Sequence, residues 1–403
     1  MRVYLDHNAT TPLHEKVREK ASQNLNFWGN PSSIHWAGRE AKNILRETRA
    51  ILAAQLGCQP LEIIFNSGGS EGNNTVIKSV WSQRSMTRNH FLCSKVEHPS
   101  VMKTYEYLQS LGAKVDFIPV SRNGELDLDF IRAHLTDKTA LISVMIANNE
   151  TGHIFPIQEV VRLAGATGTL VHVDAVQALG KMPFHLQELG VNYATFSAHK
   201  FYSLKGTGFT FVKRGSAYES LIHGGAQERH RRGGTENVFG ISALGIVAPL
   251  LKDVLIKSSQ VRKLRDDFEN KLLQLIPHVH VIGSDTDRLS NTSSFLVDGA
   301  DGETLLMSLD LKGFAISTGA ACSSGNPEPS PVLLAMGFSR LQAQTSLRVS
   351  FGWENTSEEV DAFLVALVAV VQPSAFVRRR RYCTRGIRRE DSLPRWCLPM
   401  QLE

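Results

Sequence analysis

The feature that most constrains the fold is a regular succession of short apolar runs between about residues 60 and 215. The runs are rich in β-branched and aromatic residues and are separated by longer mixed segments; they are EIIFNSGG, HFLCSKVEH, AKVDFIPV, TALISVMIANNE, TLVHVDAVQ, YATFSAHK and GTGFTFVKR. This pattern predicts strands alternating with helices in an α/β sheet. Because ligands gather beyond the carboxyl ends of such strands, we expect the polar residues that close the runs to converge on one site.

A long amphipathic segment marks a change of domain. Residues 251–275 carry apolar side chains at helical spacing, namely Val254, Leu255, Val261, Leu264, Phe268, Leu272 and Leu275. They predict one long helix, followed by a smaller α+β domain. The later run VDAFLVALVAVV, at 360–371, is too short to cross a bilayer and contains Asp361, so it predicts a buried helix. Thr356 and Glu359, just before it, form a capping-box pattern.

Composition and charge narrow the class of protein. The 403 residues are 42% hydrophobic and 21% charged, which is typical of a soluble globular chain with two domains. The whole net charge of +5 lies in residues 373–403, a tail that contains RRRR at 378–381 and that we expect to be disordered. The neutral body argues against nucleic-acid binding, and only the tail could act as a basic arm.

The cysteines and the N-terminal residues indicate a compartment. Five widely spaced cysteines form neither a disulfide framework nor a zinc pattern, so no metal is expected. The segment MRVYLDHNATTPLHEK lacks the apolar region of a secretory signal. We therefore expect a reducing cytoplasm.

Residues at the ends of three predicted strands have side chains or backbone groups that could act together on one ligand. In NSGGSEGNN, at 66–74, the backbone N–H groups near Gly69 and Ser70 could hold a phosphate at a helix start, although such a turn is often only structural. Asp174 closes the apolar run TLVHVD and requires a cationic or protonated partner. Lys200, in FSAHKFY, follows another run. A phosphate cradle, an acid for a ring nitrogen and a lysine for an imine are what pyridoxal phosphate requires.

A lone thiol lies in a different setting. Cys322 stands among small residues in ISTGAACSSGNPEPSP, at 316–331, which is typical of a loop. The segment alone allows both a reactive thiol and an ordinary turn.

A larger set of motifs identifies a resemblance. In order, the chain carries YLDHNATTP, GNPSS, SGGSEGNN, VEH, NNETG, HVDAVQALGK, SAHKFY, GGAQERHRRGGTEN, GAACSSG, EPSPVLLAMG and SLRVSFG. Over residues 1–372 it resembles the class V aminotransferase-like enzymes, which include the NifS/IscS-type cysteine desulfurases and the selenocysteine lyases. The resemblance implies the fold type I of pyridoxal-phosphate-dependent transferases. A large domain (16–250) would hold a mainly parallel seven-stranded sheet, and a smaller α+β domain (251–372) would carry the Cys322 loop and be joined by residues 1–15.

The resemblance also implies residue roles. Lys200 matches the Schiff-base lysine, Cys322 the nucleophile on a mobile loop, and His98 the imidazole that stacks on the cofactor ring. The residues implied to contact the cofactor are Gly69, Ser70, His98, Asn149, Asp174, Gln177, Ser197, His199, Lys200 and Thr235. Thr235 would come from the neighbouring subunit of a homodimer. Asn149 and Arg348 match substrate-binding residues, and a guanidinium suits an α-carboxylate.

The implied activity is conversion of L-cysteine to L-alanine, with the sulfur held on Cys322 as a persulfide for an acceptor in iron–sulfur cluster assembly or tRNA thiolation. Selenocysteine lyase and an inactive sulfur-carrier or regulatory homologue are the alternatives; a dinucleotide-dependent oxidoreductase would need a glycine fingerprint that the chain lacks. Two features depart from the family: Ser203 and Leu204 replace its usual Gly-Pro, and the tail at 373–403 differs from the C-terminal region that docks the iron–sulfur scaffold.

Overall fold

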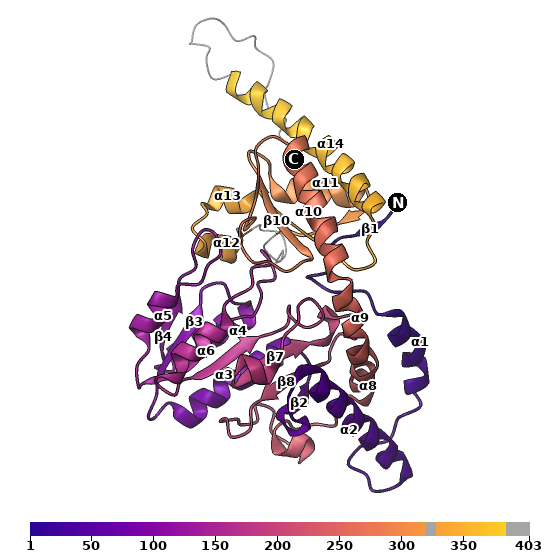
Figure 1. Ribbon diagram of the computed structural model, residues 1–403, viewed down its shortest axis with the longest axis vertical. Helices are drawn as coiled ribbons and strands as arrows, with labels where there is room; N and C mark the ends of the chain where they lie inside the picture. Colours follow the sequence, from indigo (N-terminus) through magenta and orange to yellow (C-terminus); the bar gives the residue numbers. More distant parts are fainter. Residues whose placement is uncertain (319–327, 384–403) are drawn as a thin grey trace, which may run out of the picture.

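The structure is a computed structural model that describes residues 1–318 and 328–383, with side chains for all of these except 21–22 and 372–383. Figure 1 shows two stacked lobes. The described strands are β1 (Val3–Tyr4), β2 (Ile63–Asn66), β3 (His90–Ser94), β4 (Lys114–Ile118), β5 (Thr139–Ser143), β6 (Leu170–Asp174), β7 (Tyr193–Ser197), β8 (Gly208–Val212), β9 (Val279–Val281), β10 (Thr292–Val297), β11 (Phe314–Ala315) and β12 (Ser346–Ser350).

The described α-helices are α1 (Glu15–Asn24), α2 (Trp36–Leu56), α3 (Gly69–Arg84), α4 (Pro99–Ser110), α5 (Leu128–His134), α6 (Ile157–Gly165), α7 (Leu186–Leu189), α8 (Val238–Val247), α9 (Leu251–Ile256), α10 (Ser258–Leu275), α11 (Gly302–Leu311), α12 (Pro331–Ala335), α13 (Arg340–Gln344) and α14 (Ser357–Cys383). Short 3-10 helices include η2 (Ala198–Lys200) and η3 (Gln227–His230).

The larger lobe is built on a seven-stranded sheet of order β2-β8-β7-β6-β5-β3-β4. Strands β7, β6, β5, β3 and β4 run parallel to one another, and β8 runs antiparallel to both of its neighbours. The α/β class and the mainly parallel seven-stranded sheet predicted from the sequence are thus confirmed. The carboxyl ends of the parallel strands meet at one edge of the sheet, below the smaller lobe (Figure 1).

Alternating side chains explain why both faces of this sheet are covered. Leu92 and Ile142 pack into a core with helices α2, α5, α6 and α8. Their chain neighbours Phe91 and Leu141 point the other way, into a core with α3 and α4. Strands buried on both faces read as continuous apolar runs, which is the pattern seen in the sequence.

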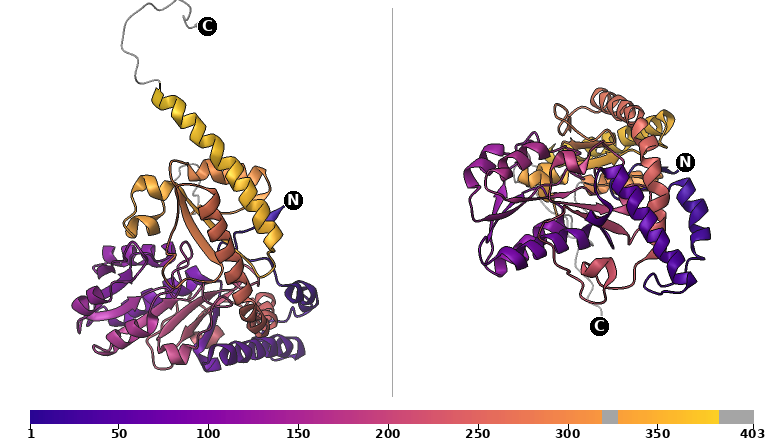
Figure 2. Two further views of the ribbon diagram at one scale, coloured as in Figure 1. Left: turned by 45° about the horizontal axis from the view of Figure 1, so that its top comes forward. Right: turned by 60° about the horizontal axis from the view of Figure 1, so that its bottom comes forward.

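The smaller lobe holds an antiparallel sheet of order β12-β10-β9. Helices α10, α11 and α14 lie beside this sheet (Figures 1 and 2). The N-terminal strand β1 pairs in parallel with β11, and Val3 of β1 packs in the core of this lobe with Leu5, which follows the strand. The first residues of the sequence therefore pack against segments that lie about 300 residues further along the chain.

The predicted helix over 251–275 is divided in the structure. Helix α9 ends at Ile256 and α10 begins at Ser258, with Lys257 between them at a ψ of −6°. Val254 packs in the core of the large sheet and Val261 in the core of the small sheet. The interruption therefore lies where the chain passes from one core to the other.

The predicted helix over 360–371 is confirmed as part of α14, which begins with the expected capping box: Glu359 N donates to Thr356 Oγ1 at 3.3 Å, and Thr356 N donates to Glu359 Oε2 at 3.2 Å. The helix continues to Cys383, so residues 373–383, predicted as disordered tail, are helical and project from the body (Figure 2). Residues 384–403 lie outside the described part of the chain. The one described stretch that is long and apolar enough to cross a membrane, Val238–Ile256, is half-buried in the protein core.

Candidate active site

The turn between β2 and α3 exposes a helix N-terminus. Gly68 adopts a φ of 141°, a backbone region that favours glycine, and offers no side chain to cap the helix. A Cβ on Gly69 would lie 2.9 Å from Val176, and one on Gly68 would lie 3.2 Å from Ser197 Oγ. Among the described residues, the backbone N–H groups of Gly69 and Ser70 donate no hydrogen bond. This end of α3 is therefore free to bind an anion.

Asp174 ends strand β6 and is 6% exposed. Its Oδ2 accepts a hydrogen bond from Asn73 Nδ2 at 2.8 Å, and its Oδ1 accepts one from Val176 N at 2.9 Å. Asn73 lies on α3, so the acid is held by the same helix whose N-terminus is open. A buried carboxylate with neutral donors alone still favours a positive partner.

His98 caps helix α4 beyond strand β3. Its Nδ1 accepts a hydrogen bond from Ser100 N at 3.1 Å and lies 2.8 Å from Ser100 Oγ. Desolvation of its ring lowers the pKa of His98, even though the residue as a whole is exposed to solvent. The charge of Lys200 lowers this pKa as well, and the charge of Asp174 raises it. The neutral imidazole is thus favoured beside the acid and the amine, and it can accept a proton.

Lys200 lies in η2, directly after β7. Its Nζ donates to the main-chain carbonyls of Asn8 and of the next residue, both at 2.7 Å. The pKa of Lys200 is lowered from 10.5 to about 8: burial is the main cause and the charge of Arg348 adds to it, while the carboxylates of Asp6 and Asp174 act in the opposite direction. A share of this amine is therefore unprotonated near neutral pH, as a nucleophile or a base requires.

Gln177 and His199 also border the lysine. Gln177 Nε2 donates to Asn8 O at 2.9 Å, and its Oε1 accepts a hydrogen bond from Lys181. Burial lowers the pKa of Lys181 well below its usual range. His199 Nδ1 lies 3.2 Å from Thr10 Oγ1, and burial lowers the pKa of His199 to about 4. The N-terminal segment is therefore a wall of the site.

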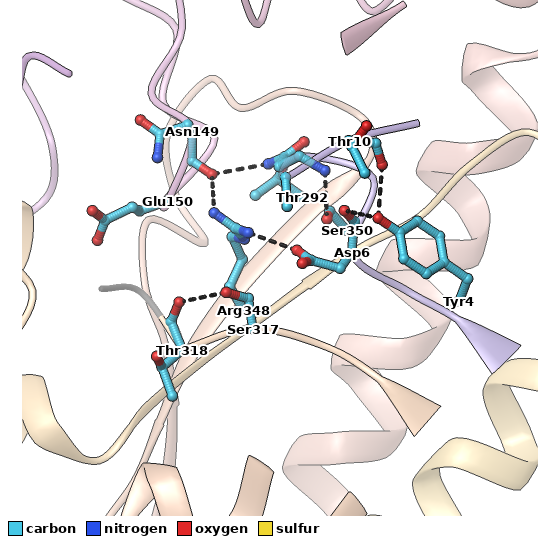
Figure 3. A network of polar contacts seen from close by, with 12 residues as sticks. Tyr4, Asp6, Thr10, Asn149, Glu150, Thr292, Ser317, Thr318, Arg348 and Ser350 are labelled. Carbon is cyan, nitrogen blue, oxygen red and sulfur yellow. Dashed lines mark hydrogen bonds and ion pairs between the residues drawn. The ribbon is translucent and has the colours of Figure 1, made fainter. Parts of the chain in front are cut away.

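Arg348 and Asn149 meet at the border with the small lobe (Figure 3). Arg348 comes from β12 and is 5% exposed. Its Nη1 donates to the main-chain oxygen of Asn149 at 3.0 Å, and its Nη2 forms an ion pair with Asp6 Oδ1 at 2.6 Å. The sequence singled out Arg348 and Asn149 but missed Asp6.

The structure gathers most of the predicted residues at one edge of the sheet. Gly69 and Ser70 begin α3, His98 follows β3 and Asn149 follows β5. Asp174 and Gln177 lie at and just after the end of β6, Ser197 and His199 lie at and just after the end of β7, and Arg348 of β12 contacts Asn149. Cys322 lies outside the described residues. Thr235 is exposed and lines a cavity of about 190 Å³ with Ser67 and Arg232. Its contact with the cofactor of a neighbouring subunit stays a prediction.

The unusual Ser203–Leu204 pair closes the turn after the lysine. Ser203 is buried, and its N–H donates to Ala198 O at 3.2 Å, while Tyr202 has a positive φ of 65°. The N-terminal segment also holds this turn, because Tyr202 N donates a hydrogen bond to Thr11 Oγ1 at 2.6 Å. Lys200 thus keeps a defined position without Gly-Pro.

Comparison with known proteins decides the family. Residues 3–363 match the aminotransferase class-V family. The chain belongs to that family. Members of the aminotransferase class-V family depend on pyridoxal phosphate, and the chain is similar to several that are cysteine desulfurases. It is 40% identical over 372 residues to the cysteine desulfurase IscS of Dictyoglomus turgidum, which covers 92% of this chain and 94% of the relative. It is also 40% identical over 373 residues to the cysteine desulfurase IscS of Methanosarcina thermophila, with 92% of each chain covered.

Comparison with solved structures supports the same fold. A NifS-like protein superposes with a TM-score of 0.87 at 37% identity, covering 92% of this chain and all of the other. The fold type I expected from the sequence is therefore confirmed.

Proposed function

We propose that the chain is a pyridoxal-phosphate-dependent cysteine desulfurase, which takes sulfur from L-cysteine and leaves L-alanine. The observation that carries the proposal is the convergence of a buried carboxylate (Asp174), a lysine of lowered pKa (Lys200) and an uncapped helix N-terminus at Gly69. The 40% identity to curated cysteine desulfurases supports the same activity.

The residues present fit the cofactor. The open N–H groups of Gly69 and Ser70 suit its phosphate, with Ser197 beside the turn. His199, two residues after Ser197, and Thr235 from a second subunit would complete the phosphate contacts. Asp174 suits a protonated ring nitrogen, Gln177 and Asn149 suit the ring's polar edge, and His98 suits its face. Bound there, pyridoxal phosphate would supply an electron sink that weakens bonds at the substrate's α and β carbons.

The protein's own groups bind the substrate and move its proton. Arg348 carries the positive charge for the α-carboxylate, and Asn149 lies against it at 3.0 Å. Lys200, with its pKa lowered to about 8, can remove a proton from the α carbon and return it. His98 favours its neutral form and can take up the thiol proton of cysteine.

The sulfur would pass to Cys322, which stays a prediction. The Cys322 thiolate attacks the sulfur of cysteine, an S–S bond forms, and the C–S bond breaks. The released electron pair takes up a proton at the β carbon, so that one cysteine and one thiol give one alanine and one persulfide. An acceptor protein, such as an iron–sulfur scaffold or a component of tRNA thiolation, would then collect the sulfur in the cytoplasm.

The test offers L-cysteine and L-selenocysteine in parallel to purified holoenzyme. We expect alanine from cysteine, a borohydride-reducible chromophore on Lys200, and a persulfide on Cys322 seen by mass spectrometry. Lys200→Ala should lose the chromophore and all turnover. Cys322→Ala should keep the chromophore but form no alanine from cysteine.

Matched controls use the same residue types. Lys205 is an exposed lysine on the same loop, and burial raises the pKa of Cys58 to about 12, which keeps that thiol inert. Lys205→Ala and Cys58→Ala should turn over like the wild type. Turnover of selenocysteine alone would make the chain a selenocysteine lyase, and a wild type that binds no cofactor would refute the proposal.

A further inference from the structure

The guanidinium of Arg348 is held on two sides by parts of the chain far apart in sequence. Asn149 contributes a main-chain oxygen from the large lobe, and Asp6 contributes a carboxylate from the N-terminal segment (Figure 3). Among the described residues, Arg348 Nε is buried and has no hydrogen-bond partner. Two contacts therefore set the plane of this side chain, and part of its donor capacity is left over.

Asp6 is itself firmly placed. It bridges to Ser350, two residues beyond Arg348 on the same strand. Its main-chain oxygen accepts a hydrogen bond from Ala9 N at 3.0 Å. The same oxygen accepts one from the Tyr4 hydroxyl at 2.9 Å (Figure 3). The Asp6 side chain is 17% exposed. A side chain on such a constrained backbone holds its partner to one position.

A need for a counter-charge does not by itself explain why the Asp6 carboxylate is paired with Arg348. A buried guanidinium without a counter-charge is costly, so Asp6 stabilises Arg348 in the free protein. The same negative charge repels a second carboxylate that approaches Arg348. A group that served only as counter-charge would therefore weaken substrate binding, whereas a fixed orientation of Arg348 would strengthen it.

We propose that Asp6 is a positioning residue, which orients Arg348 so that its remaining N–H groups meet the α-carboxylate of the substrate. This inference rests on the proposed function, in which Arg348 binds that carboxylate. Asp6 touches neither substrate nor cofactor, and its effect on the reaction passes through Arg348. The position of its oxygen matters more than its charge.

Two substitutions separate position from charge. Asp6→Asn keeps an oxygen at the same place and removes the charge, whereas Asp6→Glu keeps the charge and moves it by one methylene. Measured on the holoenzyme with L-cysteine, Asp6→Asn should leave KM within about threefold of the wild type or lower it. Asp6→Glu should raise KM about tenfold or more, with kcat within about threefold, because misplacing a charge-assisted contact weakens binding by such a factor.

A second readout does not depend on turnover. The inhibitor 3-mercaptopropionate carries the thiol and the carboxylate of cysteine without its amine. Its inhibition constant should rise in Asp6→Glu in step with KM and stay unchanged in Asp6→Asn. Glu269 forms a buried ion pair with Arg288 at 2.9 Å in the small lobe, so Glu269→Gln and Glu269→Asp control for disturbing any buried pair there.

The outcomes are distinct. A raised KM in Asp6→Asn with a normal KM in Asp6→Glu would assign Asp6 to charge balance and overturn the inference, as would a normal KM in both variants. If Asp6→Asn fails to fold, the KM of Asp6→Glu decides alone: a KM raised about tenfold or more supports the inference, and a normal KM overturns it. A wild type that forms no alanine would instead refute the proposed function.

Discussion

Glu150 is a buried carboxyl whose protonation affects stability. It follows Asn149, accepts a hydrogen bond from Ser330, and is 6% exposed. Burial raises its pKa from the ordinary 4.5 to about 7, although Ser330 and Arg348 act in the opposite direction. The folded state therefore binds this proton more tightly than the unfolded state does. Its contribution to stability is complete below about pH 4.5 and is lost as the pH rises through about 7.

Glu150→Gln should remove this dependence, since glutamine can accept the same hydrogen bond and does not titrate. Between about pH 5 and pH 8, the free energy of unfolding of the wild type should fall by about 2 to 3 kcal/mol relative to that of the variant. Urea unfolding of both proteins at the two pH values measures the difference. Parallel curves would show that Glu150 does not titrate in this range.

Single residues also show what the sequence could predict. The sequence identifies Asp174 and Lys200 because Asp174 ends an apolar strand and Lys200 follows another one by three residues. Asn8 and Lys181 were missed, although Lys181 Nζ donates to Asn8 Oδ1 at 2.8 Å and Asn8 O accepts from Lys200. Main-chain acceptors and contacts between segments far apart in sequence leave no local pattern, so only the structure reveals them.

Among the elements, α3 depends on its close approach to the sheet. At Gly72, an added Cβ would lie 2.4 Å from Thr195 Cγ2 and 2.7 Å from Thr210 Oγ1. Gly72→Ala should therefore push α3 away from β7 and β8, lowering the free energy of unfolding by about 1 to 3 kcal/mol. Cofactor affinity should fall as well, because the start of α3 moves with the helix.

A matched glycine controls for helix propensity. Gly165, at the end of α6, has nothing within 4 Å of an added Cβ. Gly165→Ala should leave stability and cofactor affinity unchanged or slightly improved. Thermal unfolding and pyridoxal-phosphate titration of both variants make the comparison. Equal behaviour of the two would contradict the close packing at Gly72.

The sequence predicts the strands of the large sheet better than it predicts the helix over 251–275. Apolar runs located the strands of the large sheet, because strands buried on both faces leave a strong signal. The helix expected over 251–275 divides at Lys257, where the chain changes from one core to another. Helical spacing continues across such a point, so the sequence pattern does not show it.

For the whole molecule, the proposed dimer can be tested by complementation. If Thr235 serves the site of the neighbouring subunit, a hybrid dimer of Lys200→Ala and Thr235→Ala subunits has one site with both native residues. Mixing the two impaired variants under conditions of subunit exchange should then restore alanine formation. No recovery, with exchange confirmed by mass spectrometry, would place Thr235 in its own subunit's site.

The pairing of β1 with β11 bears on the timing of synthesis. Residues 3–10 leave the ribosome long before residues 314 and 348, yet Val3 pairs with Phe314 and Asp6 contacts Arg348. Domains generally fold as units during translation, and contacts of large sequence separation form late. The large sheet can therefore form on the nascent chain, while the contact by which we propose that Asp6 orients Arg348 can form only after residue 348 has been made.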